Sequence, residues 1–314
     1  MKITPFRMAA LAVVLVILSA CAAAPSSTSS PGSPAAPAAA EPPPPAQNLL
    51  GATDELQLVV ELALDLGKKY GGDRVLVALD IDNTLLAMEQ DLGSDQWFYW
   101  QQDLEQQNPC SPQLVNGRLE VQGALYYASA MRPTQADAAQ QVRRMQDAGL
   151  KVIGLTARGS DYRLATFREL RRNGFSLWKT AWPPQAGFAD EFTPEGLARP
   201  VRYEDGVLFA AGQDKGLVLQ ALFNRSGVGQ PVLVVMVDDK RANLQEVMKA
   251  FSFSSTKVHA WHYPREAPVV AAFDADAAAR QWDALRPALE QVEQILGPDN
   301  FDLPADAARA GCAP

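Results

Sequence analysis

The feature that most constrains this chain is a short apolar run that ends in two aspartates. Residues 75–79 read Val-Leu-Val-Ala-Leu, a continuous aliphatic run that is typical of a strand buried on both faces of a parallel sheet. Asp80 and Asp82 follow, where the strand opens into a loop. Ligands of open α/β sheets bind at this carboxyl end of the strands. The segment therefore indicates an enzyme, although two carboxylates that cap the next helix would give the same pattern.

Predicted strands and helices alternate along most of the chain. This alternation is typical of a parallel sheet with right-handed crossovers, so we expect an α/β, Rossmann-like parallel sheet flanked by helices. The apolar runs predict strands over residues 75–80, 151–156, 207–210, 231–237 and 256–260. The apolar periodicity predicts helices over residues 54–69, 134–148, 161–172, 215–223, 241–250 and 268–296.

Three local patterns refine this expectation. Thr134, with Asp137 three positions later, resembles a capping box at a helix start. The tripeptide Glu204-Asp205-Gly206 predicts a hairpin turn. Pro287 predicts a bend in the Ala-rich C-terminal helix. Residues 87–131, rich in Gln, Trp and Tyr, interrupt the alternation and predict a mostly helical insertion.

The N-terminus resembles an export signal. A positively charged start and the apolar run 8–18 predict a signal peptide over residues 1–20. Leu18-Ser19-Ala20-Cys21 resembles the bacterial lipobox, which implies diacylation of Cys21 and cleavage before it. Ala22 resembles the residue found in lipoproteins that are sent to the outer membrane. We therefore expect a lipid-anchored protein of the cell envelope, in the outer membrane and facing the periplasm; a plain secretory signal is the alternative.

The next segment has the composition of a spacer. Residues 21–47, after the lipidated cysteine, consist almost only of Ala, Pro, Ser, Thr and Gly, which cannot bury a core, so we expect an extended tether before a domain over 48–314. Cys110 and Cys312 are the remaining cysteines, and they form either a periplasmic disulfide or two buried thiols. A net charge of -8 without a basic cluster argues against nucleic acid as a partner.

Three further segments put reactive side chains at strand ends or helix starts. Thr156, followed by Ala157-Arg158-Gly159, suits a phosphate oxygen, although a strand-end threonine is also a common helix cap. Lys215 opens a helix, where the dipole disfavours a cation, so it either neutralises an anion or lies in solvent. Asp238 and Asp239 follow the most apolar strand and would repel each other without a cation, which favours a metal site over a surface pair.

Taken in this order, the four segments resemble the motifs of the haloacid dehalogenase-like superfamily of aspartyl-phosphate hydrolases, over about residues 70–262. Asp80-Ile81-Asp82-Asn83-Thr84 matches the DxDxT signature, and Thr156, Lys215 and Asp238-Asp239 match the second, third and fourth motifs. The four aspartates and the lipid anchor also look like the secreted class C acid phosphatases. The sequences around the second and fourth motifs are more similar to an uncharacterised branch of the superfamily.

The resemblance implies a Mg²⁺-dependent phosphomonoester hydrolase that acts on a small-molecule phosphate ester. Asp80 would attack phosphorus to form an aspartyl phosphate, and Asp82 would act as the general acid and base. Mg²⁺ would bind Asp80, the carbonyl oxygen of Asp82, and Asp239, with Asp238 either as a further ligand or as a partner of the ligands. A phosphotransferase and a non-catalytic envelope binding protein are the alternatives. The residues expected to hold the phosphoryl group or the substrate are Thr156, Ala157, Arg158 and Lys215. For Arg158, an exposed surface position is the alternative.

The insertion at 87–131 lies where this superfamily has a cap over the site. Within it, the run Trp97-Phe98-Tyr99-Trp100 either lines the substrate pocket or packs inside the cap.

Overall fold

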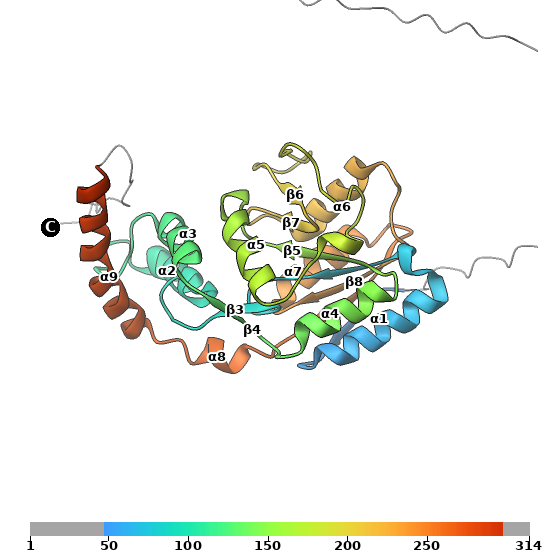
Figure 1. Ribbon diagram of the computed structural model, residues 1–314, viewed down its shortest axis with the longest axis horizontal. Coiled ribbons are helices and arrows are strands. Elements are labelled where there is room, and N and C mark those ends of the chain that lie inside the picture. Colours follow the sequence, from blue (N-terminus) through green and yellow to red (C-terminus); the bar gives the residue numbers. More distant parts are fainter. Residues whose placement is uncertain (1–46, 298–314) are drawn as a thin grey trace, which may run out of the picture. The chain divides into compact units, whose positions relative to one another are not determined.

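The computed structural model describes residues 47–297, which form an α/β fold around a seven-stranded sheet (Figure 1). The strand order is β1-β9-β8-β2-β5-β7-β6, and every neighbouring pair is parallel except β6 and β7. The expected Rossmann-like class is therefore confirmed. The strands are β1 Leu49–Ala52, β2 Val75–Leu79, β5 Lys151–Thr156, β6 Arg202–Glu204, β7 Val207–Phe209, β8 Leu233–Asp238 and β9 Lys257–His262.

The central strands end side by side. β2 lies between β5 and β8, and every residue of β2 and β8 is buried, as their continuous apolar sequences predict. Leu79 pairs with Gly154 on one side and Val237 on the other. The residues that follow these positions, including Asp80 and Asp238, therefore meet at one edge of the sheet.

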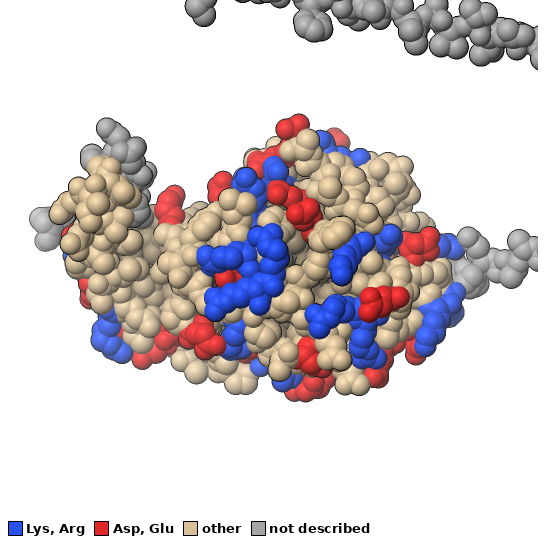
Figure 2. Space-filling model, viewed as in Figure 1, with Lys and Arg blue, Asp and Glu red and all other residues tan. Residues whose placement is uncertain are grey.

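Helices cover both faces of the sheet. The helices α1 (Leu56–Tyr70), α4 (Ala138–Asp147) and α5 (Arg163–Arg172) contribute to the core on one face, and α6 (Lys215–Ser226) and α7 (Arg241–Ala250) contribute to the core on the other. In Figure 2, Lys and Arg gather over α5, with acidic residues dispersed around them.

The insertion forms a cap, as expected. It consists of α2 (Asp95–Gln107) and α3 (Arg118–Ala128) on a two-stranded antiparallel stem of β3 (Leu86–Met88) and β4 (Met131–Pro133). Trp97 is buried in the core of the cap. The guanidinium of Arg168 on α5 donates to the carbonyl oxygens of Tyr126, Tyr127 and Ser129, so α5 fastens the C-terminal end of α3.

The C-terminal helix belongs to this cap, which the sequence did not indicate. The helix predicted over residues 268–296 is instead two helices, α8 (Ala267–Ala271) and α9 (Ala275–Leu296). Pro287 lies inside α9. Ala278 of α9 is part of the buried cap core, and Gln281 accepts a hydrogen bond from the Leu92 N–H at 2.9 Å. Two distant chain segments therefore build the cap, and Figure 1 shows α2, α3 and α9 together at one end of the domain.

Two local expectations had different outcomes. The hairpin is confirmed, because Asp205 and Gly206 both have positive φ between β6 and β7. The capping box is wrong: the Thr134 hydroxyl donates to the Thr84 carbonyl oxygen at 2.5 Å, and α4 begins at Ala138. The threonine is used to tie the stem to the loop after β2 rather than to start a helix.

Several expectations fall beyond the part of the chain that is described. The signal peptide, the tether with Cys21, and Cys312 lie outside it. Cys110 is disulfide-bonded, and its pairing with Cys312 stays a prediction. Within residues 47–297, no helix combines the length and apolar character needed to cross a membrane.

Candidate active site

A tight turn after β2 presents the first two aspartates. The Ile81 carbonyl oxygen accepts hydrogen bonds from the N–H groups of residues 84–86, and Asn83 adopts a positive φ of 56°. The Asp80 N–H donates to the Val237 carbonyl oxygen at 2.9 Å, which continues the ladder with β8 beyond the strand. The turn therefore fixes Asp80 against the strand that carries the fourth motif.

Lys215 lies between two of the predicted aspartates. Its Nζ is 2.7 Å from Asp80 Oδ1 and 2.7 Å from Asp238 Oδ2, and its side chain is 2% exposed. Asp214 caps α6 by accepting from the N–H groups of Gly216 and Leu217, so the lysine occupies the first turn of a well-capped helix. The surface-lysine alternative is therefore wrong, and the lysine joins the first and fourth motifs.

The two adjacent aspartates of the fourth motif have different environments. Both oxygens of Asp238 are used, by Lys215, by the Lys240 N–H and by Asn243 Nδ2. Asp239 Oδ1 is buried and has no hydrogen-bond partner among residues 47–297. Carboxylate oxygens of Asp80, Asp238 and Asp239 lie within 4.8 Å of one another. A buried, unpartnered carboxylate beside two others is the donor set that Mg²⁺ prefers, and Asp239 is its best-suited direct ligand.

Charge counting leads to the same ion. The buried or half-buried carboxylates that meet at this edge are Asp80, Asp82, Asp95, Asp238 and Asp239. The cations that contact them are Arg158, Lys215 and Lys240. Five carboxylates against three cations leave two negative charges in excess, which one divalent cation would balance. Buried charge without compensation is costly, so the residues present fit Mg²⁺.

Arg158 contacts Asp82 rather than solvent. Its guanidinium donates to both Asp82 oxygens, at 2.9 and 2.7 Å, and to Thr166 Oγ1 at 2.7 Å. The same group lies 4.1 Å from the ring centroid of Tyr126. Burial acts to raise the pKa of Asp82, but the two-pronged contact with Arg158 outweighs it and lowers that pKa. Asp82 is therefore ionised at neutral pH.

The second motif forms one wall of the site. The fully buried Thr156 accepts a hydrogen bond at Oγ1 from the Arg158 N–H at 3.1 Å. The N–H groups of residues 210–212 donate to the carbonyl oxygens of Thr156, Arg158 and Ala157 in turn. Three hydrogen bonds therefore join this loop to the segment before Lys215 and give the wall a fixed shape.

Two further residues, Asp95 of the cap and Lys240 beside the fourth motif, belong to the site but were not predicted as site residues. Lys240 Nζ lies 2.7 Å from Asp95 Oδ2 and 3.8 Å from the ring centroid of Tyr99. Asn83 Nδ2 also reaches Asp95 Oδ2, at 3.4 Å. The position of Lys240 directly after Asp238-Asp239 was a usable signal, whereas nothing in the insertion sequence distinguishes Asp95.

A cavity of about 560 Å³ opens above Asp82 between the cap and the sheet edge. Its walls include Tyr99 and Tyr126 from the cap, Ala157 and Arg158 from the second motif, and Gly212 from the loop before Lys215. A volume of this order is typical of small-molecule sites. The aromatic run of α2 is divided between both expected roles, because Trp97 packs in the cap and Tyr99 lines the cavity.

We expect Mg²⁺ to stabilise the folded protein through Asp239. A ligand at about 100 times its Kd adds about 2.7 kcal/mol, which for a domain of this size raises Tm by about 5–10 °C. Asp239→Asn should abolish most of this shift, because it removes the negative charge and replaces one carboxylate oxygen by an NH₂ group, whereas the exposed Asp190→Asn should keep it. Thermal unfolding with Mg²⁺ and with chelator measures both. Equal Mg²⁺-dependent shifts in Tm for the two variants would show that Asp239 does not bind the ion.

The metal-free protein should lose stability as pH rises. Burial, with the nearby Asp80 carboxylate, raises the pKa of Asp239 to about 9, and burial with Asp238 raises the pKa of Asp80 to about 7. In the unfolded chain both carboxyls have a pKa of about 3.9. Above that pH the folded state therefore holds protons that the unfolded state has released. The free energy of unfolding is therefore highest, as far as these two groups are concerned, below about pH 4, and it falls as pH rises toward about 9. Urea unfolding in chelator across this range should show a falling free energy, and a shallower fall with saturating Mg²⁺.

Comparison with known proteins gives a family without an assigned activity. Residues 55–294 match the family described as "Protein of unknown function (DUF2608)", and the match spans α1, the sheet edge and the cap. No curated protein and no solved structure matches the chain.

Proposed function

The chain belongs to the DUF2608 family, and we propose that it is a Mg²⁺-dependent phosphomonoester hydrolase that acts through an aspartyl phosphate on Asp80. One observation carries the proposal: Lys215 bridges Asp80 and Asp238, while a buried Asp239 oxygen beside them has no hydrogen-bond partner in the part of the chain that the structure describes. This constellation lies at the carboxyl edge of the sheet and beside a capped cavity. We further propose that the chain is a member of the haloacid dehalogenase-like superfamily.

Asp80 is the proposed nucleophile. Lys215 and Asp238 fix the orientation of its carboxylate, with Oδ1 held by the lysine Nζ. A carboxylate oxygen of Asp80 would form a bond to phosphorus while the bond from phosphorus to the alcohol oxygen breaks. Water would then attack the phosphorus of the aspartyl phosphate, releasing inorganic phosphate and restoring Asp80. Lys215 would donate to a phosphoryl oxygen as negative charge shifts toward it.

Asp82 is the proposed acid and base, and Arg158 controls its availability. Protonation of the leaving alcohol requires a protonated Asp82, but both of its oxygens accept from Arg158 in this structure. A phosphoryl group in the cavity offers Arg158 a second two-pronged acceptor. Movement of the Arg158 guanidinium to the phosphoryl oxygens would release Asp82 to take a proton from solvent and give it to the leaving alcohol oxygen. The Asp82 carboxylate would later take a proton from the attacking water.

Mg²⁺ would be held by the carboxylates of Asp80 and Asp239 and by the carbonyl oxygen of Asp82, with Asp238 fixed beside them by Lys215 and Asn243. When bound, the ion supplies positive charge that lets two anions, carboxylate and phosphate ester, approach each other. We propose that the mature protein is anchored in the cell envelope through Cys21 and hydrolyses phosphate esters in the periplasm.

Phosphate release tests the function. The chain from residue 48 is incubated with a panel of phosphomonoesters, in Mg²⁺ and in chelator. The expected result is phosphate release that saturates with substrate and stops in chelator. Tight binding of esters without release would favour a binding protein, and phosphate found on a second alcohol would favour a phosphotransferase.

A further inference from the structure

We propose that Arg199 is a specificity-determining residue that reads a second negative charge on the leaving group of the substrate. The inference rests on the proposed hydrolase function and specifies its substrate class. Phosphate esters whose alcohol part carries a carboxylate or a second phosphate would be favoured over esters with neutral or cationic tails.

Arg199 reaches the cavity from a part of the chain far from the cap. It lies in the irregular segment between residues 178 and 205, and it lines the cavity together with Gly212. Its Nη2 donates to the Gly212 carbonyl oxygen at 3.0 Å. A carbonyl oxygen orients the guanidinium without cancelling its charge, so most of its donors stay available to an anion.

The backbone of Arg199 is hydrogen-bonded to the loop just before α6. The Gln213 side chain accepts from the Arg199 N–H at 2.8 Å and donates to the Arg199 carbonyl oxygen at 3.0 Å. Gln213 lies two residues before Lys215, the bridge between Asp80 and Asp238. This double contact fixes the arginine relative to the reaction centre, which an incidental surface arginine does not need.

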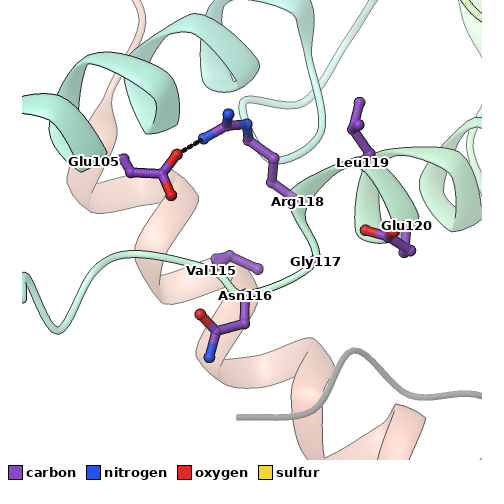
Figure 3. Close-up of a pocket in the computed structure, with 7 residues that line it drawn as sticks. All are labelled: Glu105, Val115, Asn116, Gly117, Arg118, Leu119 and Glu120. Atoms are coloured by element: carbon purple, nitrogen blue, oxygen red, sulfur yellow. Dashed lines mark hydrogen bonds and ion pairs between the residues drawn. The ribbon is translucent and has the colours of Figure 1, made fainter. Parts of the chain in front are cut away.

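The other cations of the cavity are already engaged. Arg158 pairs with Asp82, and Arg118 pairs with Glu105 at 2.8 Å across the gap between α2 and α3, as Figure 3 shows. Among the described residues, Arg199 forms no ion pair with a carboxylate. An entering phosphate dianion adds two negative charges to a site that Mg²⁺ has only just balanced, so a free cation at the wall stabilises an anionic substrate.

Three of the four aromatic residues that line the cavity are engaged by cations, and the fourth, Tyr162, packs edge-on against Tyr126. Phe98, Tyr99 and Tyr126 each have a cation over one face, from Arg118, Lys240 and Arg158 respectively. These rings therefore already hold three cations by cation–π contact, Arg118 from the cap and Arg158 and Lys240 from the sheet edge. The walls select by charge rather than by aromatic stacking.

One acidic residue of the cavity opposes this assignment and sharpens its test. Asp161 also lines the cavity, is exposed, and makes no side-chain hydrogen bond or ion pair in the described part of the chain. Unlike Arg199, it has no contact that orients it toward the reaction centre. If Asp161 dominated, esters with a cationic tail would be preferred.

Three phosphate esters of similar size separate these outcomes: 3-phosphoglycerate, glycerol 3-phosphate and phosphoethanolamine carry an anionic, a neutral and a cationic tail. The wild type should show the highest kcat/KM for 3-phosphoglycerate. Arg199→Gln should lower that value about tenfold and leave the value for glycerol 3-phosphate within about twofold. Arg171 on α5 is exposed, and Arg171→Gln is the matched control, which should change neither of these two kcat/KM values.

Calorimetric titration of the same esters makes the outcome independent of turnover. If the wild type binds 3-phosphoglycerate more tightly than Arg199→Gln does but hydrolyses no ester, the hydrolase function is disproved and the role of Arg199 stands. If the wild type and Arg199→Gln hydrolyse the esters with the same preference, or if the wild type prefers phosphoethanolamine, the role of Arg199 is disproved and the hydrolase function stands.

Discussion

Asp80→Asn should lower kcat by about 10⁴-fold or more while the protein stays folded, because an amide cannot form the acyl phosphate. The change keeps the shape of a side chain that is almost wholly buried, and it removes one of two neighbouring carboxylates whose repulsion, with burial, raises the pKa of Asp80. We therefore expect the metal-free variant to be no less stable than wild type. Steady-state phosphate release and thermal unfolding of the same preparation measure the two effects.

The matched control is Asp190→Asn, the same change on an exposed loop. It should leave both kcat and Tm unchanged. A variant at Asp80 that retains more than about a hundredth of the wild-type kcat would show that this carboxylate is not the nucleophile.

Lys215→Met should destabilise the metal-free protein by about 3–5 kcal/mol, because it leaves two buried carboxylates facing each other without their cation. The side chains of Lys215, Asp80 and Asp238 are 2%, 7% and 0% exposed, so water cannot replace the lysine. For a domain of this size the loss corresponds to a Tm lower by about 10 °C. Urea unfolding in chelator measures it directly.

The control for this variant is Lys68→Met, which removes an ion pair of similar length at the surface. Lys68 pairs with Asp65 at 2.9 Å, and both side chains are more than 70% exposed. Exposed pairs contribute little, so this change should alter stability by less than about 1 kcal/mol. A similar, small effect of both substitutions would mean that Lys215 does not hold the two aspartates together.

The sequence predicted which side chains meet at the edge of the sheet because its signals are local. Apolar runs predict buried parallel strands, and the residues at the carboxyl ends of these strands then lie at one shared edge. Asp80, Thr156 and Asp238 meet there for this reason. Lys215 could be assigned only as an exception to a helix-dipole rule, and the structure gives its reason in the two aspartates beside it.

The sequence could not predict the parts that depend on long-range packing. Asp95 and Arg199 are ordinary polar residues in irregular or inserted segments, and only the fold brings them to the cavity. The same holds for α9, whose Ala-rich pattern indicates a helix but not the cap against which it packs. The edge strand β1 was missed because its four residues, half of them exposed leucines, lack a run long enough to indicate a strand.

The central claim is a covalent phosphate on Asp80, and reductive trapping tests it most directly. Borohydride reduces an acyl phosphate to an alcohol, so trapping during turnover would convert Asp80 to homoserine, which tandem mass spectrometry locates in the peptide after β2. We predict homoserine at position 80 when substrate and Mg²⁺ are both present, and none in chelator. Phosphate release with Asp80 unmodified, or with the trap at another residue, would contradict the account.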